Sequence, residues 1–198
     1  MPAYHHGNLR ATLLEAAERS LREHGAEQLS LRELAREAGV SHAAPRRHFA
    51  DRQALLDALA ETGFARLDTE LRAALATAGA DFPVRLHAVS AAYLRFATED
   101  AALLDVMYAG KHRADRVAEA AAAPFGLLND VIKDGQKHGA IAPGDPHRPG
   151  VLLLATLQGI AALTNGRLVI PELLDGILEA AVEQFLAGQR TDGQRTSG

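Results

Sequence analysis

The residues of this chain that could do chemistry gather in one short stretch, residues 41–52. The stretch holds three arginines, two histidines and one aspartate, giving a net charge of +2 with neutral His: Arg46, Arg47, Arg52, His42, His48 and Asp51. Guanidinium and imidazole N–H groups are donors for phosphate oxygens and for the acceptor edges of bases. The pattern therefore indicates nucleic-acid recognition. A cationic run is also typical of a solvated helix face, and both interpretations are open at this point.

No other pattern in the sequence is typical of catalysis or of metal binding. The chain has no cysteine, which excludes disulfides, thiolate metal sites and a cysteine nucleophile. It has nine histidines, but those in the first 50 residues lack the spacing that would place ligands on one helical face. His-Glu-x-x-His, a Gly-rich phosphate loop and Gly-x-Ser-x-Gly are all missing. We expect no enzymatic activity, no metal and no cofactor.

Helices must position the cationic stretch, because the composition favours helix throughout. Ala and Leu account for 40 and 29 of the 198 residues, and no run alternates β-branched with polar residues. Apolar spacing and capping residues therefore predict an all-α chain. Pro124 is expected to kink or split its helix. The expected helices span residues 8–24, 30–38, 41–49, 51–78, 82–98, 100–108, 113–138, 147–167 and 172–187.

The second and third expected helices form a helix-turn-helix pattern. Residues 30–33, Ser-Leu-Arg-Glu, fit a capping box, and Gly39 provides a left-handed turn. The helix over residues 41–49 is too short to be stable alone and must dock on its neighbours. Pro45 removes one early backbone bond, so the first turn of that helix is expected to be tightened or irregular. This motif also occurs in proteins that never meet DNA.

The charge is distributed unevenly along the chain. The net charge is −4 and the isoelectric point is near 6.1. Residues 1–60 hold 8 basic and 8 acidic side chains, whereas residues 61–198 hold 13 and 17, so the acidic excess belongs to the second part. Phosphate contacts should then be few per protomer, and DNA binding should depend on dimerisation and weaken as salt rises. No run of 18 apolar residues is present, so we expect no membrane span and a cytoplasmic location.

The N-terminal part resembles the TetR family of transcriptional repressors. The matching runs are SLRELAREAGVS at residues 30–41, His-Phe at residues 48–49 and DRQALL at residues 51–56. The lead-in YHHGNLR at residues 4–10 resembles one subgroup of that family. In Arg46 the chain departs from the family, which usually has an aromatic residue there.

Weaker matches continue toward the C-terminus, where AYLRFA at residues 92–97 and LQG at residues 157–159 resemble the C-terminal domain of the same subgroup. The resemblance implies a three-helix helix-turn-helix DNA-binding domain over residues 1–60 and a helical ligand-binding and dimerisation domain over residues 61–187. The polar tail, residues 188–198, is expected to be disordered.

Roles follow from the resemblance together with the residue types. His42, Ala43 and Arg46 are expected to face base edges, with Arg32 reaching a base as well. Ser30, Arg47, His48 and Arg52 are expected to hold phosphates, although His48 could instead anchor its helix by packing. The full set of expected DNA-binding residues is Ser30, Arg32, Ser41, His42, Ala43, Arg46, Arg47, His48 and Arg52.

The resemblance also implies a ligand pocket and a homodimer formed by the last two helices. Apolar residues at helical spacing are also typical of an ordinary core. The pocket candidates are Phe64, Leu67, Leu71, Tyr93, Phe96, Met107, Tyr108, Phe125 and Leu128. The interface candidates are Leu153, Leu157, Ile160, Ile177, Leu178, Ala181 and Phe185.

These expectations combine into one functional hypothesis and one alternative. The hypothesis is a homodimeric repressor that binds a near-palindromic operator in double-stranded DNA through two successive major grooves. A small-molecule effector would favour a second conformation and release the DNA. The alternative is a helical small-molecule-binding protein that has lost or altered its DNA binding, which the departure at Arg46 keeps open.

Overall fold

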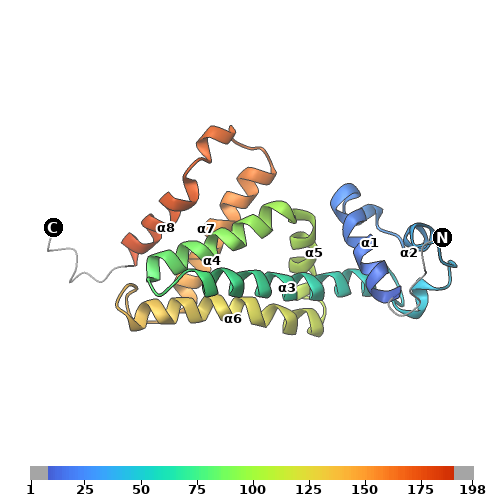
Figure 1. Ribbon diagram of the computed structural model, residues 1–198, viewed down its shortest axis with the longest axis horizontal. Helices are drawn as coiled ribbons and strands as arrows, with labels where there is room; N and C mark the ends of the chain where they lie inside the picture. The colour runs from blue at the N-terminus through green and yellow to red at the C-terminus, as the bar shows by residue number, and fades with distance from the viewer. Residues whose placement is uncertain (1–8, 190–198) are drawn as a thin grey trace. The chain divides into compact units, whose positions relative to one another are not determined.

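The computed structural model describes residues 9–189 and confirms that this part of the chain is all-α, with no strand (Figure 1). The eight α-helices are α1 (Leu9–His24), α2 (Leu31–Glu37), α3 (Arg52–Thr77), α4 (Phe82–Glu99), α5 (Ala101–Lys111), α6 (Asp115–Lys137), α7 (His147–Asn165) and α8 (Ile177–Gly188). Three short 3-10 turns are η1 (Ala26–Gln28), η2 (Pro45–Arg47) and η3 (Pro171–Leu173). None of these described helices is long and apolar enough to cross a membrane. The start of the lead-in and the tail from residue 190 lie outside the described residues.

The chain divides into two compact units. The first comprises Met1–Ala65 with Asp100–Ala121, and the second comprises Arg66–Glu99 with Ala122–Gly198. Helices α3 and α6 each contribute residues to both units, whereas α5 belongs wholly to the first. The helix-turn-helix elements thus share a unit with a later helix of the chain. The functional boundary expected at residue 60 stays a prediction.

In the first unit, α1 packs against α2, η1 and α5. The side chains of Leu13, Leu21 and Leu34 are buried there. Arg22 Nη2 of α1 lies 2.8 Å from Oδ1 of Asp100, the residue that precedes α5. The hydrogen bond to Asp100 raises the pKa of Arg22. Apolar packing and one charged contact therefore join the helix-turn-helix elements to α5.

The ends of α2 match the sequence expectation. Ser30 Oγ accepts a hydrogen bond from the amide of Glu33 at 3.2 Å. Gly39 has φ +65°, and the amide of Val40 donates to the carbonyl of Ala35 at 2.9 Å. This last bond spans five residues, as in a Schellman motif. The expected cap and left-handed turn are confirmed.

In the second unit, α4 packs against both α7 and α8, which form a hairpin (Figure 1). Asn165 Nδ2, at the end of α7, donates to the carbonyl of Ala97 at 2.9 Å and so ties the two helix ends together. His87 Nε2 of α4 lies 3.3 Å from Glu179 Oε1 of α8. A backbone hydrogen bond and the His87 contact lower the pKa of Glu179.

The helices around Pro124 and Gly176 differ from those expected. Helix α6 continues through Pro124, so the proline does not split it. The Pro124 side chain is buried. The helix expected over residues 172–187 starts only at Ile177. Before it lie η3 and Gly176, which has φ +69° and interrupts the helical path.

Candidate nucleic-acid interface

The cationic stretch is not the α-helix expected over residues 41–49, and that prediction is wrong. The stretch consists of turns around the three-residue 3-10 helix η2. The amide of Ala44 donates to the carbonyl of Ser41 at 2.9 Å, and the amide of His48 donates to the carbonyl of Pro45 at 2.9 Å. These bonds span three residues instead of four. Pro45 has no N–H to donate to Ser41, so the four-residue pattern is broken at its start. The irregular first turn expected from this proline is confirmed.

Two apolar side chains anchor the stretch. Pro45 and Phe49 are both buried, with Phe49 only 2% exposed. Helix α2 packs against η2 across the Gly39 turn. Because these anchors sit on the inner side, the polar residues of the stretch face outward. The sequence predicted that a short helix over residues 41–49 would dock on its neighbours. The segment does dock, but as a turn and not as a helix.

The residues expected to read bases and phosphates are largely exposed. Ser41, His42, Ala43, Arg46, Arg47 and His48 are all exposed, as is Arg32 on α2. The exposure of His48 argues against the packing role considered for it. Among the residues that the structure describes, Arg32, Arg46 and Arg47 have no carboxylate within ion-pair distance. Their charge is therefore available to an anionic partner.

Two expected phosphate-binding residues also have structural roles. Ser30 is half-buried and its hydroxyl caps α2, as described above. Arg52, at the start of α3, donates from Nε to the carbonyl of Leu29 at 3.0 Å and from Nη2 to the carbonyl of Ala26. The Arg52 guanidinium thus holds the loop between α1 and α2 and stabilises the unit.

Arg10 was missing from the expected DNA-binding residues, and the structure places it beside the cationic stretch. Its guanidinium carbon lies 5.5 Å from the centre of the Phe49 ring, a cation–π distance. The Arg10 side chain is exposed at the first turn of α1. The sequence offered only weak guidance here, because the contact joins residues 39 positions apart through a ring whose location depends on the η2 turn.

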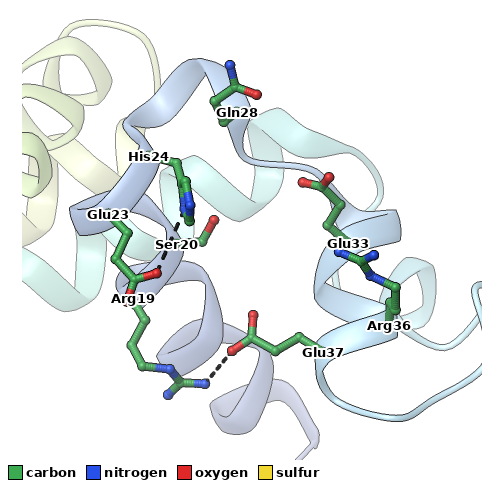
Figure 2. Close-up of a pocket in the computed structure, with 8 residues that line it drawn as sticks. All are labelled: Arg19, Ser20, Glu23, His24, Gln28, Glu33, Arg36 and Glu37. Atoms are coloured by element: carbon green, nitrogen blue, oxygen red, sulfur yellow. Dashed lines mark hydrogen bonds and ion pairs between the residues drawn. The ribbon is translucent and has the colours of Figure 1, made fainter.

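A polar hollow of about 520 Å³ lies between α1 and α2 in the same unit. Figure 2 shows Arg19 and Glu37 pointing toward each other across it, with Arg19 Nη2 2.7 Å from Glu37 Oε1. None of the expected DNA-binding residues lines the hollow, and its two arginines face three glutamates. A net negative lining disfavours phosphate, so the hollow is not part of the candidate interface. Its lining residues are Arg19, Ser20, Glu23, His24, Gln28, Glu33, Arg36 and Glu37.

The residues expected to form a ligand pocket are mostly core residues. Within the first unit, Phe64 and Met107 are fully buried, and the Phe64 ring lies edge-on to Tyr108 with 6.5 Å between ring centres. Phe125 and Tyr108 are half-buried. The expected ligand role of this set stays a prediction. Within the second unit the buried members are Leu67, Leu71, Tyr93, Phe96 and Leu128.

Helices α7 and α8 frame an apolar groove of about 350 Å³. Of the expected interface residues, Ile160, Ile177, Ala181 and Phe185 line it. Leu153 and Leu157 are instead buried within the protomer, at 4% and 1% exposure.

Two of the three positions by which α7 lines the groove lie one residue earlier in the chain than the expected interface residues, and the third is the expected Ile160. Leu152 and Thr156 line the groove, and Leu152 is 52% exposed. Helical spacing alone does not tell which of two adjacent leucines faces outward, because α7 is apolar on more than one side. The sequence also missed Ala180 and Gln184, which line the groove from α8.

Two protein-family models match the chain. Residues 13–59 match bacterial regulatory proteins of the tetR family, and residues 86–185 match the Tetracyclin repressor-like C-terminal domain. No curated protein shows significant similarity to the chain. The first match covers the helix-turn-helix elements and the second spans α7 and most of α8.

Solved structures share the fold. A protein of unknown function from Rhodococcus sp. RHA1 is 44% identical, with a TM-score of 0.89 over 96% of this chain and 100% of its own. A tetR-family bacterial regulatory protein from Rhodococcus RHA1 is 18% identical, with a TM-score of 0.71 over 93% and 98%. The transcriptional regulator FadR from Bacillus subtilis, solved with stearoyl-CoA, is 16% identical, with a TM-score of 0.72 over 90% and 98%. The last two likenesses concern the fold alone.

Proposed function

Because this chain belongs to the tetR family of bacterial regulatory proteins, we propose that it is a homodimeric repressor that binds a near-palindromic DNA operator. The observation that carries the proposal is the set of exposed arginines without carboxylate partners, Arg32, Arg46 and Arg47, in the helix-turn-helix unit. Arg19 of the same unit is exposed as well but is paired with Glu37. The unpaired charges suit phosphates and guanine edges.

Within this proposal Arg46 reads a base, and Arg47 binds phosphate with His48. Arg46 and His42 are exposed on the turn that the buried Pro45 and Phe49 anchor. The η2 geometry presents these side chains from a turn and not from a helix, so the operator contacts come from a few adjacent residues. DNA sequence selectivity should then concentrate on a small number of base pairs per half-site.

The test is selection of bound DNA from a random library with the full chain, followed by binding of the selected site. Arg46→Ala should weaken binding to that site by about 1–3 kcal/mol and relax selectivity at one position. Arg19→Ala is the matched control, because Arg19 is exposed on the same unit but paired with Glu37. Failure of the wild-type protein to select any sequence at moderate salt would overturn the proposal and favour the alternative, a helical small-molecule-binding protein.

The proposed dimer forms when a second copy covers the α7–α8 groove. The groove is lined mainly by apolar side chains, and Leu152 and Val151 beside it are 52% and 66% exposed. Two such helix pairs related by a two-fold axis would make a four-helix bundle and bury this surface. Two half-sites one helical turn apart would then be bound together.

Sedimentation of variants tests the dimer. Leu152→Glu places a charge in the groove and should shift the protein toward monomer at micromolar concentration. Val84→Glu is the control, because Val84 is similarly exposed at the start of α4 but does not line the groove. A monomeric wild-type protein under the same conditions would remove the dimer from the proposal.

A small-molecule effector completes the proposed cycle. The effector must bind the DNA-free conformation more tightly than the DNA-bound one, because only differential affinity shifts such an equilibrium. A regulator of this kind would act in the cytoplasm. Titration of the selected operator complex with candidate effectors, followed by DNA release, tests this step.

A further inference from the structure

The exposed surface of the cationic stretch is rich in hydrogen-bond donors and lacks carboxylates and side-chain amides. Residues 41–50, SHAAPRRHFA, include no Asp, Glu, Asn or Gln. Arg46 and Arg47 are exposed there, and among the described residues no carboxylate lies within ion-pair distance of either. A guanidinium carries N–H donors and no acceptor. The charged groups that this surface offers to a base are therefore donors.

The acidic and amide side chains that follow next in the chain are already bound within the protein. Asp51 Oδ1 accepts from the amide of Ala54 at 2.8 Å and so caps the start of α3. Gln53 Nε2 donates to Asp57 Oδ1 at 2.7 Å. The two glutamates of α2 instead line the polar hollow described above. These groups do not add acceptors to the exposed surface of residues 41–50.

The backbone that carries Arg46 is fixed by hydrogen bonds and by burial on both sides. The amide of Arg47 donates to the carbonyl of Ala44 at 3.2 Å, and the amide of Phe49 donates to the carbonyl of Pro45 at 2.9 Å. Pro45 and Phe49 are both buried. A side chain on such an anchored backbone loses less freedom on binding than one on a mobile loop. Arg46 is thus presented from a preorganised position.

Guanine is the base whose major-groove edge matches a surface of this kind. It presents two acceptors, N7 and O6, side by side, and a guanidinium can donate to both. Adenine places its N6 donor beside N7, and cytosine presents its N4 donor. Asn or Gln usually reads the adenine edge and Asp or Glu the cytosine edge, and residues 41–50 have none of these four types.

We propose that Arg46 determines operator specificity by binding N7 and O6 of one guanine per half-site in the major groove. This inference rests on the proposed repressor function and adds the base that the protein reads. The G·C pair at this position is then required in one orientation, because the reversed pair turns the cytosine N4 donor toward the guanidinium. Arg47 contributes a phosphate contact, which holds the protein on DNA without reading a base.

Modified bases in the selected operator test the contact with the full-length protein. The position to modify is the one at which Arg46→Ala loses selectivity. Guanine there is replaced by 7-deazaguanine, which lacks the N7 acceptor, or by hypoxanthine, which keeps N7 and O6 and lacks the amino group of the minor groove. 7-Deazaguanine should weaken wild-type binding roughly 10- to 150-fold, the ratio expected for one hydrogen bond to a charged donor. Hypoxanthine should leave the affinity about unchanged.

Two variants assign the effect to a side chain. Arg46→Ala should bind the guanine and 7-deazaguanine operators equally, because it has no donor for N7. Arg47→Ala is the matched control, since Arg47 is the next residue and is also exposed. It should weaken binding to every sequence and keep the full penalty for 7-deazaguanine. A penalty that persists in Arg46→Ala, or that disappears in Arg47→Ala, would overturn the assignment to Arg46.

The remaining outcomes separate this inference from the proposed function. Selection of no sequence by the wild-type protein would overturn both. If a sequence is selected but Arg46→Ala loses selectivity at no position, or at a position without guanine, the regulator stands and the guanine contact is wrong. The same conclusion follows if wild type binds the 7-deazaguanine operator as tightly as the guanine operator. A loss with hypoxanthine alone would place the contact in the minor groove and also overturn the inference.

Discussion

The amide of Ala44 donates a hydrogen bond to the carbonyl oxygen of Ser41 at 2.9 Å, and Pro45, the next residue, has no amide hydrogen to offer that oxygen. In an α-helix that oxygen would accept from residue 45. The proline makes this bond impossible, and the chain closes a tighter turn in its place. The missing donor of Pro45 thus excludes the four-residue bond that would begin an α-helix at Ser41.

Replacing this proline should change the backbone of the segment. Pro45→Ala restores the amide, so residues 41–49 should gain α-helical character, seen as Cα chemical shifts moving toward helical values. Pro83→Ala is the control, because Pro83 lies in the first turn of α4, where amides have no helical partner. Unchanged shifts in Pro45→Ala would show that packing of the segment, and not the missing donor, sets its conformation.

We expect Arg52 to contribute to the free energy of unfolding even when no DNA is bound. Loss of its hydrogen bonds to Leu29 and Ala26 in Arg52→Ala should lower the free energy of unfolding by about 1–3 kcal/mol. Arg52→Lys keeps the charge but has no planar fork to reach both carbonyls, so it should recover only part of the loss. Chemical denaturation measures both. Full recovery by lysine would assign the effect to charge alone.

Arg10 should contribute a phosphate contact from outside the segment. Arg10→Ala should weaken binding to specific and random DNA equally and reduce the slope of log affinity against log salt by about 1. Arg19→Ala, which removes an arginine paired with Glu37, should leave the slope unchanged. A loss confined to the selected operator would instead place Arg10 at a base.

Two glycines should respond to alanine with opposite signs. Gly39 has φ +65°, so Gly39→Ala should destabilise the protein by about 1 kcal/mol. Gly126 lies inside α6, and a Cβ there would meet no atom within 4 Å. Gly126→Ala should therefore stabilise by about 0.4–1 kcal/mol through reduced freedom of the unfolded chain. Denaturant midpoints of the two variants check both signs.

Glu179, through a backbone hydrogen bond and its contact with His87, should make the stability of the protein sensitive to acid. The pKa of Glu179 is lowered in the folded protein from an ordinary value of 4.5. Its ionised form therefore adds stability above about pH 4.5, and this contribution is lost as the pH falls through the lower folded value. The Tm difference between wild type and Glu179→Gln should shrink between pH 6 and pH 3. A difference that stays constant would show that the ionisation of Glu179 does not affect stability.

The sequence predicted the elements whose signals are local. Helix α2 was placed to within one residue at each end, because Ser30 and Gly39 carry capping and turn chemistry in their residue types. The all-α class followed in the same way from composition and spacing. The segment over residues 41–49 was only half predicted. Pro45 signalled irregularity, but the outcome depended on how its ring and Phe49 pack.

Local sequence patterns could not predict which side chains contact each other, nor which face of a helix points outward. Arg52 looked like a phosphate ligand by charge, and only the fold reveals the carbonyls of Ala26 and Leu29 beside it. Leu153 and Leu152 are equivalent in hydrophobicity, yet one is buried and the other is exposed. Arg10 approaches Phe49 only because the turn brings distant residues together. Such relations require the tertiary packing.

The brevity of η2 also has an electrostatic consequence. A three-residue turn aligns too few peptide dipoles to build a macrodipole, so the segment itself contributes almost no partial positive charge at its start. The nearest long array of aligned peptides is α3, with 26 residues beginning at Arg52. Attraction of an anion to the segment therefore depends on the formal charges of its side chains. The positive end of an aligned backbone is presented next to the segment, at the first turn of α3.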